Sequence, residues 1–129
     1  MKKTKGVKKT VLLAEDDPLL IDIYSTKLKN AGFKVEIAKD GNECLTKLRE
    51  KKSDVLLLDI VLPQISGWEV LRQIKGDEGF KGLKIIILSN LGQKNEVKKG
   101  LELGAVRYLI KSHYTPSQVV EEIKKLLKQ

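Results

Sequence analysis

Four short apolar runs in this chain each end in a polar group that could carry chemistry. The runs cover residues 11–14, 55–58, 85–88 and 108–110, and the groups that follow are an acidic triplet at 15–17, Asp59, Ser89 and Lys111. Runs of this length are typical of strands buried on both faces of a parallel sheet. If the runs are such strands, their polar endings meet at the carboxyl edge of the sheet, where ligands of open α/β sheets bind.

Helix-like segments separate the strand-like runs, which predicts βαβ units and a parallel sheet. We expect strands at 10–14, 34–38, 54–58, 84–88 and 106–110, and helices at 17–31, 41–51, 66–75, 93–103 and 116–128. Asp17 followed by Pro18, and Thr115 followed by Pro116, are typical of helix starts. Gly32 is typical of a helix end.

The pattern of apolar residues predicts which strands lie at the edges of the sheet. Residues 34–37 alternate between polar and apolar, and Arg107 interrupts the last strand, so the second and fifth strands are expected at the edges. The other three are expected inside. This gives a doubly wound, flavodoxin-like sheet of five parallel strands in the order 2-1-3-4-5, and Asp16 and Asp59 fall at its crevice. The first and last helices should bury apolar stripes, namely Leu20, Ile23, Tyr24, Leu28 and Ala31, and Val119, Val120, Ile123, Leu126 and Leu127.

Composition limits the class of protein. The chain has 129 residues, 41% hydrophobic and 33% charged, which fits one globular domain with a core of its own. Its apolar runs fall well short of the roughly 18 residues that indicate a membrane span, and no signal-peptide pattern is present, so we expect a cytoplasmic protein. The single cysteine, Cys44, excludes an internal disulfide, and its place in a predicted helix favours an inert, packed thiol.

The formal net charge of +8 raises the question of a nucleic-acid partner. Residues 2–9 hold five lysines and no acid, so this segment supplies most of the excess. We therefore expect a flexible basic tail over 1–9 and one domain over 10–129, and we do not expect nucleic acid as a partner. No helix-turn-helix or zinc module is recognisable in the sequence, which points the same way.

Taken together, the polar groups at the strand ends resemble the receiver domain of two-component response regulators. The resemblance covers almost the whole chain, including the segment 104–111. Each feature alone is a weak signal, but their order and their positions at strand ends make the combination specific. The residues that carry it are Glu15, Asp16, Asp59, Pro63, Gly67, Ser89 and Lys111.

The resemblance implies that Asp59 accepts a phosphoryl group from a phosphohistidine on a sensor histidine kinase or phosphotransfer protein. It also implies that Mg²⁺ is held by Glu15, Asp16, Asp59 and the backbone carbonyl of Val61, since clustered carboxylates are hard oxygen ligands. Ser89 and Lys111 would bind the phosphoryl oxygens as charge develops.

The same resemblance implies a switch and a slow reset. Ser89 and Tyr108 would couple the phosphorylated site to a partner-binding face built from helix 93–103, strand 106–110 and helix 116–128. No enzymatic activity is expected beyond phosphoryl transfer to the chain itself and slow autodephosphorylation, because Val61 and Leu91 are apolar beside the expected water path. We expect no output domain in this chain, which would act through protein contacts as a phosphoryl shuttle or a diffusible regulator.

The sequence departs from the family at two positions. Ser112 follows Lys111 where proline in a cis peptide bond is usual, so the geometry of that bond stays open. Asn90 follows Ser89 where a small residue is usual.

Two other functions are weighed against the receiver. A flavodoxin-like cofactor binder would need a first loop that accepts phosphate, whereas the acids at 15–17 would repel it. An aspartyl-phosphate phosphohydrolase would need a second acid two residues after Asp59, where Val61 stands. Trp68 is expected to pack, and His113 to lie in a loop without a phosphorelay role.

Overall fold

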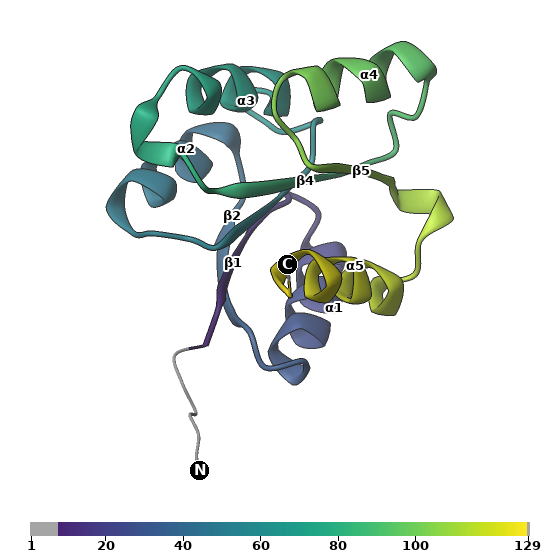
Figure 1. Cartoon of the computed structure of the whole chain (residues 1–129). Coiled ribbons are helices and arrows are strands. Elements are labelled where there is room, and N and C mark those ends of the chain that lie inside the picture. The colour runs from purple at the N-terminus through teal and green to yellow at the C-terminus, as the bar shows by residue number, and fades with distance from the viewer. Residues whose placement is uncertain (1–7, 129) are drawn as a thin grey trace.

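The computed structural model describes residues 8–128 as strands and helices in alternation (Figure 1). The expected tail over 1–9 lies almost wholly outside this range. Every predicted element is present, and each bound differs from the prediction by at most one residue. The elements are β1 Thr10–Ala14, α1 Pro18–Asn30, β2 Lys34–Ala38, α2 Gly41–Glu50, β3 Val55–Leu58, α3 Gly67–Lys75, β4 Lys84–Ser89, α4 Lys94–Glu102, β5 Arg107–Ile110 and α5 Pro116–Leu127. Two short 3-10 helices were not predicted, η1 Glu78–Phe80 and η2 Lys111–His113.

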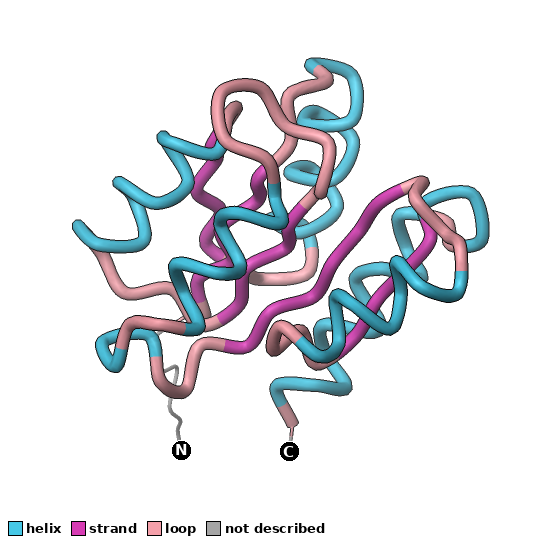
Figure 2. The backbone as a smooth tube through the Cα atoms, turned by 90° about the horizontal axis from the view of Figure 1, so that it is seen from above, coloured by secondary structure: helices cyan, strands magenta, loops and turns pink. Residues whose placement is uncertain are grey.

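The five strands form one parallel sheet in the order β2-β1-β3-β4-β5, which confirms the predicted doubly wound topology. Helices α2, α3 and α4 lie on one side of the sheet and α1 and α5 on the other (Figures 1 and 2). The carboxyl ends are nearly level, because Ala14 pairs with Leu58 and Leu58 pairs with Ile87. The residues that follow these strands therefore meet at one edge.

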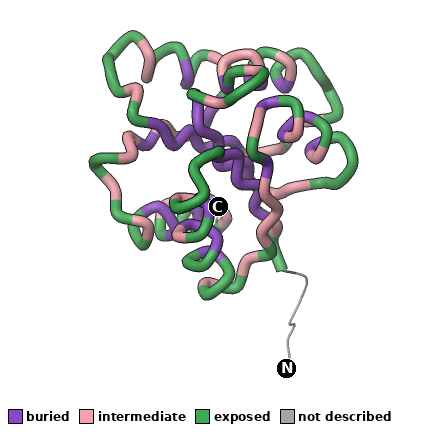
Figure 3. The backbone as a smooth tube through the Cα atoms, turned by 180° about the vertical axis from the view of Figure 1, so that it is seen from behind, coloured by how far each residue is buried: buried purple, intermediate pink, exposed green. Residues whose placement is uncertain are grey.

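Each face of the sheet carries its own core, because successive strand residues point to opposite faces. Leu12, Leu56 and Ile87 pack toward α2 and α3, whereas Leu13 and Leu57 pack toward α1 and α5. The interior strands are buried except at the first residues of β1 and β4, Thr10 and Lys84, and Figure 3 shows the buried centre of the sheet. These buried strands fix the position, along the strand direction, of the polar residue that follows each of them.

The helices confirm most of the predicted packing, with one correction. Helix α5 buries all of its predicted stripe except Leu127, which is half-buried. Helix α1 buries Ile21 and Ser25, which were not predicted. Three residues of the predicted stripe are only half-buried, namely Leu20, Ile23 and Ala31, the C-cap. The hydroxyl of Ser25 donates to the carbonyl of Asp22 at 3.3 Å, so its burial leaves no donor unpaired.

Cys44 lies in the core and has no exposed surface. Burial, with the nearby charges of Asp40 and Glu43, raises the pKa of its thiol to about 12. The thiol is therefore protonated at neutral pH, in agreement with the predicted inert role. None of the helices formed by residues 8–128 has both the length and the apolar character needed to cross a membrane.

Candidate functional site

Three acidic side chains meet at the carboxyl edge between β1 and β3. The amide of Glu15 donates to the carbonyl of Ala38, and that of Asp59 donates to the carbonyl of Ala14, both at 3.0 Å. These bonds continue the sheet by one residue, so the backbone under both carboxylates is held as firmly as a strand. Glu15, Asp16 and Asp59 each offer a carboxylate oxygen, and these oxygens lie within 4.8 Å of one another. The predicted acidic cluster is confirmed.

Lys111, the first residue after β5, provides the positive charge of this cluster. Its Nζ donates to Glu15 Oε1 at 2.8 Å and to Asp59 Oδ2 at 2.7 Å. Burial by itself would lower the pKa of Lys111, but the hydrogen bonds and charges of Asp59 and Glu15 outweigh burial and raise this pKa above the usual 10.5. Lys111 is thus a cation at any physiological pH, and it is ion-paired with both carboxylates.

The second oxygen of each buried carboxylate accepts a backbone amide. Asp59 Oδ1 accepts from the amide of Val61 at 3.2 Å, and Glu15 Oε2 accepts from the amide of Asp17 at 3.1 Å. Asp17 itself caps α1 by accepting from the amide of Leu19 at 2.9 Å, as its position predicted. These bonds fix the rotation of both carboxylates, whereas Asp16 stays exposed and free to turn toward a ligand.

Ser89 and Tyr108 are joined through Leu91 in the loop after β4. Ser89 is fully buried, and its Oγ accepts from the amide of Leu91 at 3.3 Å. The hydroxyl of half-buried Tyr108 donates to the carbonyl of the same residue, Leu91. Burial is the main cause that raises the pKa of Tyr108 from 10.0 to about 12. The two predicted switch residues, Ser89 and Tyr108, are therefore both hydrogen-bonded to the backbone of Leu91.

The start of α3 packs directly behind Asp59. A Cβ added at Gly67 would lie 2.6 Å from the Asp59 carbonyl oxygen, so only glycine fits. The adjacent Trp68 is half-buried, and the Nζ of Lys99 in α4 lies 4.3 Å from the centroid of its ring. The packing role predicted for Trp68 is confirmed, but nothing in the sequence pointed to Lys99 as its partner.

The bond between Lys111 and Ser112 is trans, as are all peptide bonds among residues 8–128. His113 lies in η2 and is exposed.

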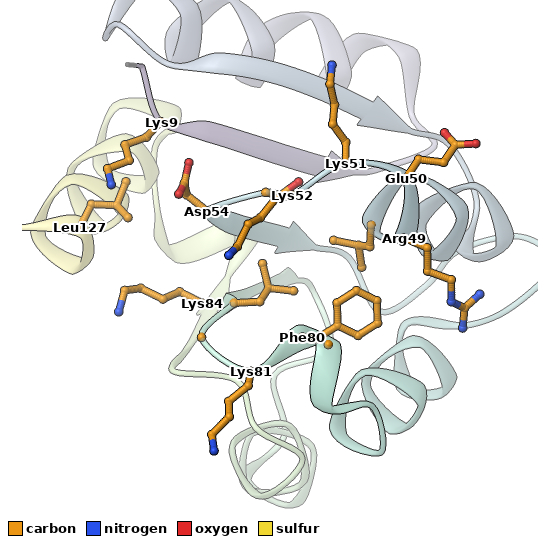
Figure 4. Close-up of a pocket in the computed structure, with 15 residues that line it drawn as sticks. Lys9, Arg49, Glu50, Lys51, Lys52, Asp54, Phe80, Lys81, Lys84 and Leu127 are labelled. Atoms are coloured by element: carbon orange, nitrogen blue, oxygen red, sulfur yellow. The ribbon is translucent and has the colours of Figure 1, made fainter. Parts of the chain in front are cut away.

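A cavity with a volume of about 530 Å³ lies at the opposite, amino edge of the sheet (Figure 4). None of the predicted site residues lines it. The cations around it are exposed or half-buried side chains, and those near the end of α2 complement the negative end of the helix dipole. The acidic site is therefore recognised by its chemistry and not by this cavity. The cations that line the cavity are Lys9, Arg49, Lys51, Lys52, Lys81 and Lys84.

Comparison with known proteins agrees with this geometry. A family model described as the response regulator receiver domain matches residues 11–124. The chain belongs to this receiver family. The DNA-binding response regulator MtrA of Mycolicibacterium smegmatis is 31% identical over 95% of this chain, and the match covers 52% of MtrA. The receiver thus spans about half the length of that relative.

Two solved structures show the same likeness in three dimensions. A CheY-like receiver domain protein from Methanospirillum hungatei is 29% identical, with a TM-score of 0.87 over 95% of each chain. The Mn²⁺-bound form of the response regulator Rcp1 is 25% identical, with a TM-score of 0.82 over 92% of this receiver and 94% of that chain. Glu15, Asp16 and Asp59 therefore cluster as in receiver domains that bind a divalent metal. Family membership also argues against the flavodoxin-like and phosphohydrolase alternatives.

Proposed function

We propose that residues 10–129 form a cytoplasmic receiver domain in which Asp59 accepts a phosphoryl group from the phosphohistidine of a sensor histidine kinase or phosphotransfer protein. The main support is the position of Asp59, which shares Lys111 with Glu15 and lies in the acidic cluster with Glu15 and Asp16. A buried carboxylate with an ammonium at 2.7 Å can meet an anionic phosphoryl group without a prohibitive charge repulsion.

The transfer itself needs only positioning and charge neutralisation. A carboxylate oxygen of Asp59 attacks the phosphorus, the P–N bond of the phosphohistidine breaks, and the imidazole leaves with the bonding electrons. Mg²⁺ bound by Glu15, Asp16, Asp59 and the Val61 carbonyl would neutralise negative charge on the phosphoryl oxygens. The donor set fits this ion, because three carboxylate oxygens within 4.8 Å are hard ligands on one side of the site.

Lys111 and Ser89 complete the proposed site, because each would donate to a phosphoryl oxygen. The ammonium of Lys111 already donates to Asp59 Oδ2 at 2.7 Å, so it has only to pass to a phosphoryl oxygen after transfer. Ser89 Oγ accepts a hydrogen bond from Leu91, which leaves the proton of the hydroxyl to donate to another phosphoryl oxygen.

The output of the proposed switch is the face formed by α4, β5 and α5. Movement of Ser89 pulls on Leu91, and Leu91 holds the hydroxyl of Tyr108. Tyr108 is half-buried and bonded to this loop, and we propose that its ring moves further inward as the loop shifts on phosphorylation. Lys94 and Lys98 of α4 are exposed, and their charges support a partner with an anionic surface, which we propose to be an acidic protein. Other cations of this face are paired with acids on α5, namely Arg107, Lys124 and Lys125.

The decisive experiment is intact-protein mass spectrometry after treatment with acetyl phosphate and Mg²⁺. The wild-type chain should gain one phosphoryl group, and Asp59→Asn should gain none. Asp77→Asn is the matched control, because Asp77 is exposed and only caps η1. Labelling of Asp59→Asn, or no labelling of the wild type at saturating Mg²⁺, would remove the proposal.

We also expect a long-lived phosphoaspartate, because the side chains beside the expected water path cannot orient water. Val61 is 62% exposed and Leu91 is half-buried, and both are apolar. The double variant Val61→Asn with Leu91→Gln should lose phosphate about tenfold faster, which corresponds to about 1.4 kcal/mol of activation free energy. Phosphate release is measured at saturating Mg²⁺, with Val61→Ala and Leu91→Ala as the apolar control, and an unchanged rate contradicts the prediction.

A further inference from the structure

Helix α4 contacts the core of the receiver through a single buried residue, Gly100. Val97 is half-buried, and Leu101 is 45% exposed. Glycine is a poor helix former because its backbone loses the most freedom on folding. A glycine at the one buried position of a helix therefore indicates that close approach is needed there.

The space around Gly100 shows what that approach accommodates. A Cβ at this position would lie 2.6 Å from Ile87 Cδ1 and 2.8 and 3.0 Å from two ring carbons of Tyr108. The tyrosine ring thus lies directly against the backbone of α4. Gly92, just before the helix, makes a similar contact, since its Cβ would lie 2.9 Å from Ile110 Cδ1.

If Gly100 had a side chain, both of these neighbours would have to move, because each has an atom less than 3.0 Å from the added Cβ. Ile87 is fully buried in the middle of β4, but the atom that it presents is Cδ1, the free end of its side chain, which a small rotation can withdraw. Tyr108 is half-buried on β5 near the edge of the sheet, and its ring can swing into solvent. A Cβ at position 100 would therefore displace Tyr108 and break its hydrogen bond to Leu91.

We propose that Gly100 is a positioning residue that holds the ring of Tyr108 against α4 in the unphosphorylated receiver. The residue at position 100 thereby sets the position of the Tyr108 ring before phosphorylation, and glycine favours the position against α4. This inference rests on the proposed function for its meaning in signalling, but the position of the ring can be measured without phosphorylation.

The test is Gly100→Ala, with Gly76→Ala as the matched control. Gly76 ends α3, and a Cβ there would lie 3.6 Å from the Arg72 carbonyl oxygen, which is an ordinary contact. NMR of ¹³C-labelled tyrosine, assigned with Tyr108→Phe, follows the ring. In Gly100→Ala, nuclear Overhauser contacts between the Tyr108 ring and residue 100 should vanish, and the pKa of Tyr108 should fall from about 12 toward 10.0. In Gly76→Ala both should stay unchanged.

A second variant covers the case in which Gly100→Ala does not fold. Ile87→Val with Gly100→Ala removes the atom at 2.6 Å and leaves the clash with the tyrosine ring. This variant should also expel Tyr108. A ring that keeps its contacts and its pKa in either folded variant would overturn the proposal. Acetyl phosphate labelling of Asp59 is measured in parallel, and its failure in the wild type would remove the proposed function without affecting the result for the ring.

Discussion

Helices α4 and α5 flank the same edge strand but are held in opposite ways. Helix α5 buries Val119, Val120, Ile123 and Leu126 against α1 and the sheet. Helix α4 buries only a glycine, and its other attachments are polar or lie at the surface. They include the Lys99 ammonium over the Trp68 ring and a hydrogen bond of 3.1 Å from Lys75 Nζ to the carbonyl of Glu102.

Helix α5 therefore contributes more to the stability of the fold, and helix α4 can move at a lower cost in free energy. Burial of one large aliphatic side chain contributes roughly 1.5–3 kcal/mol, so α5 has several times the apolar anchorage of α4. Elements with few buried apolar contacts open at lower free energy than the core does. Helix α4 is therefore the element best suited to move, while α5 provides a fixed surface beside it.

The largest effect that distinguishes the two helices should be on global stability. Ile123→Ala in α5 should lower the free energy of unfolding by about 3 kcal/mol, because it leaves a cavity in a fully buried site. Leu101→Ala in α4 should change it by less than about 0.5 kcal/mol, since Leu101 is 45% exposed. Urea unfolding measures both. Equal losses would mean that α4 is anchored as firmly as α5.

Native-state hydrogen exchange should show the same contrast without mutation. Amides of α4 should exchange at least about 100-fold faster than those of α5, a difference of about 2.7 kcal/mol in opening free energy. Exchange in α4 should also be insensitive to low urea, because local opening exposes little surface. Similar protection in the two helices would refute the distinction.

As pH rises, the packing of α4 against β5 should loosen at a lower pH than the packing of α5. The folded receiver raises the pKa of Tyr108 from 10.0 to about 12, so the buried ring adds stability below pH 10 that is lost as pH rises toward 12. The raised pKa of Lys111 acts in the same direction, at pH above 10.5. Methyl NMR signals of Val97 and Leu101 should shift over this range, and those of Val119 should not. Tyr108→Phe is the control, and an identical shift in that variant would assign the effect to another group.

The smallest effect concerns the contact between α3 and α4. Lys99→Met removes the cation over the Trp68 ring and should cost about 0.5–1 kcal/mol of local stability in α4. Trp68 fluorescence should change in this variant, because the charge lies 4.3 Å from the centroid of the ring. Lys98→Met is the neighbouring control. A fluorescence change of the same size in the control would show that the contact is not specific.

The sequence predicted the sheet and the acidic cluster because both depend on short-range patterns. Fully apolar runs mark interior strands, and a residue just after such a strand must lie at the carboxyl edge. Glu15 and Asp59 needed no further information, since they follow adjacent strands.

Contacts that depend on the exact distance between elements could not be predicted in this way. The bridge of Lys111 to both Glu15 and Asp59 joins residues that are 96 and 52 positions apart. From the sequence, Gly100 is only a weak helix former. Its proposed role depends on the contact with the Tyr108 ring of β5, which the sequence does not show. The choice of Ile21 over Leu20 in α1 likewise depends on how the helix is rotated against α5.

The bridge formed by Lys111 gives the acidic edge a built-in counter-ion. A cluster of three carboxylates normally needs metal to remain compact, but here an internal ammonium occupies that electrostatic role for Glu15 and Asp59. An incoming divalent ion would therefore compete with a tethered cation at these oxygens. Replacing Lys111 by a neutral residue would remove the competing ammonium. The same edge would then bind divalent ions more tightly, at the expense of the cation proposed to contact the phosphoryl group.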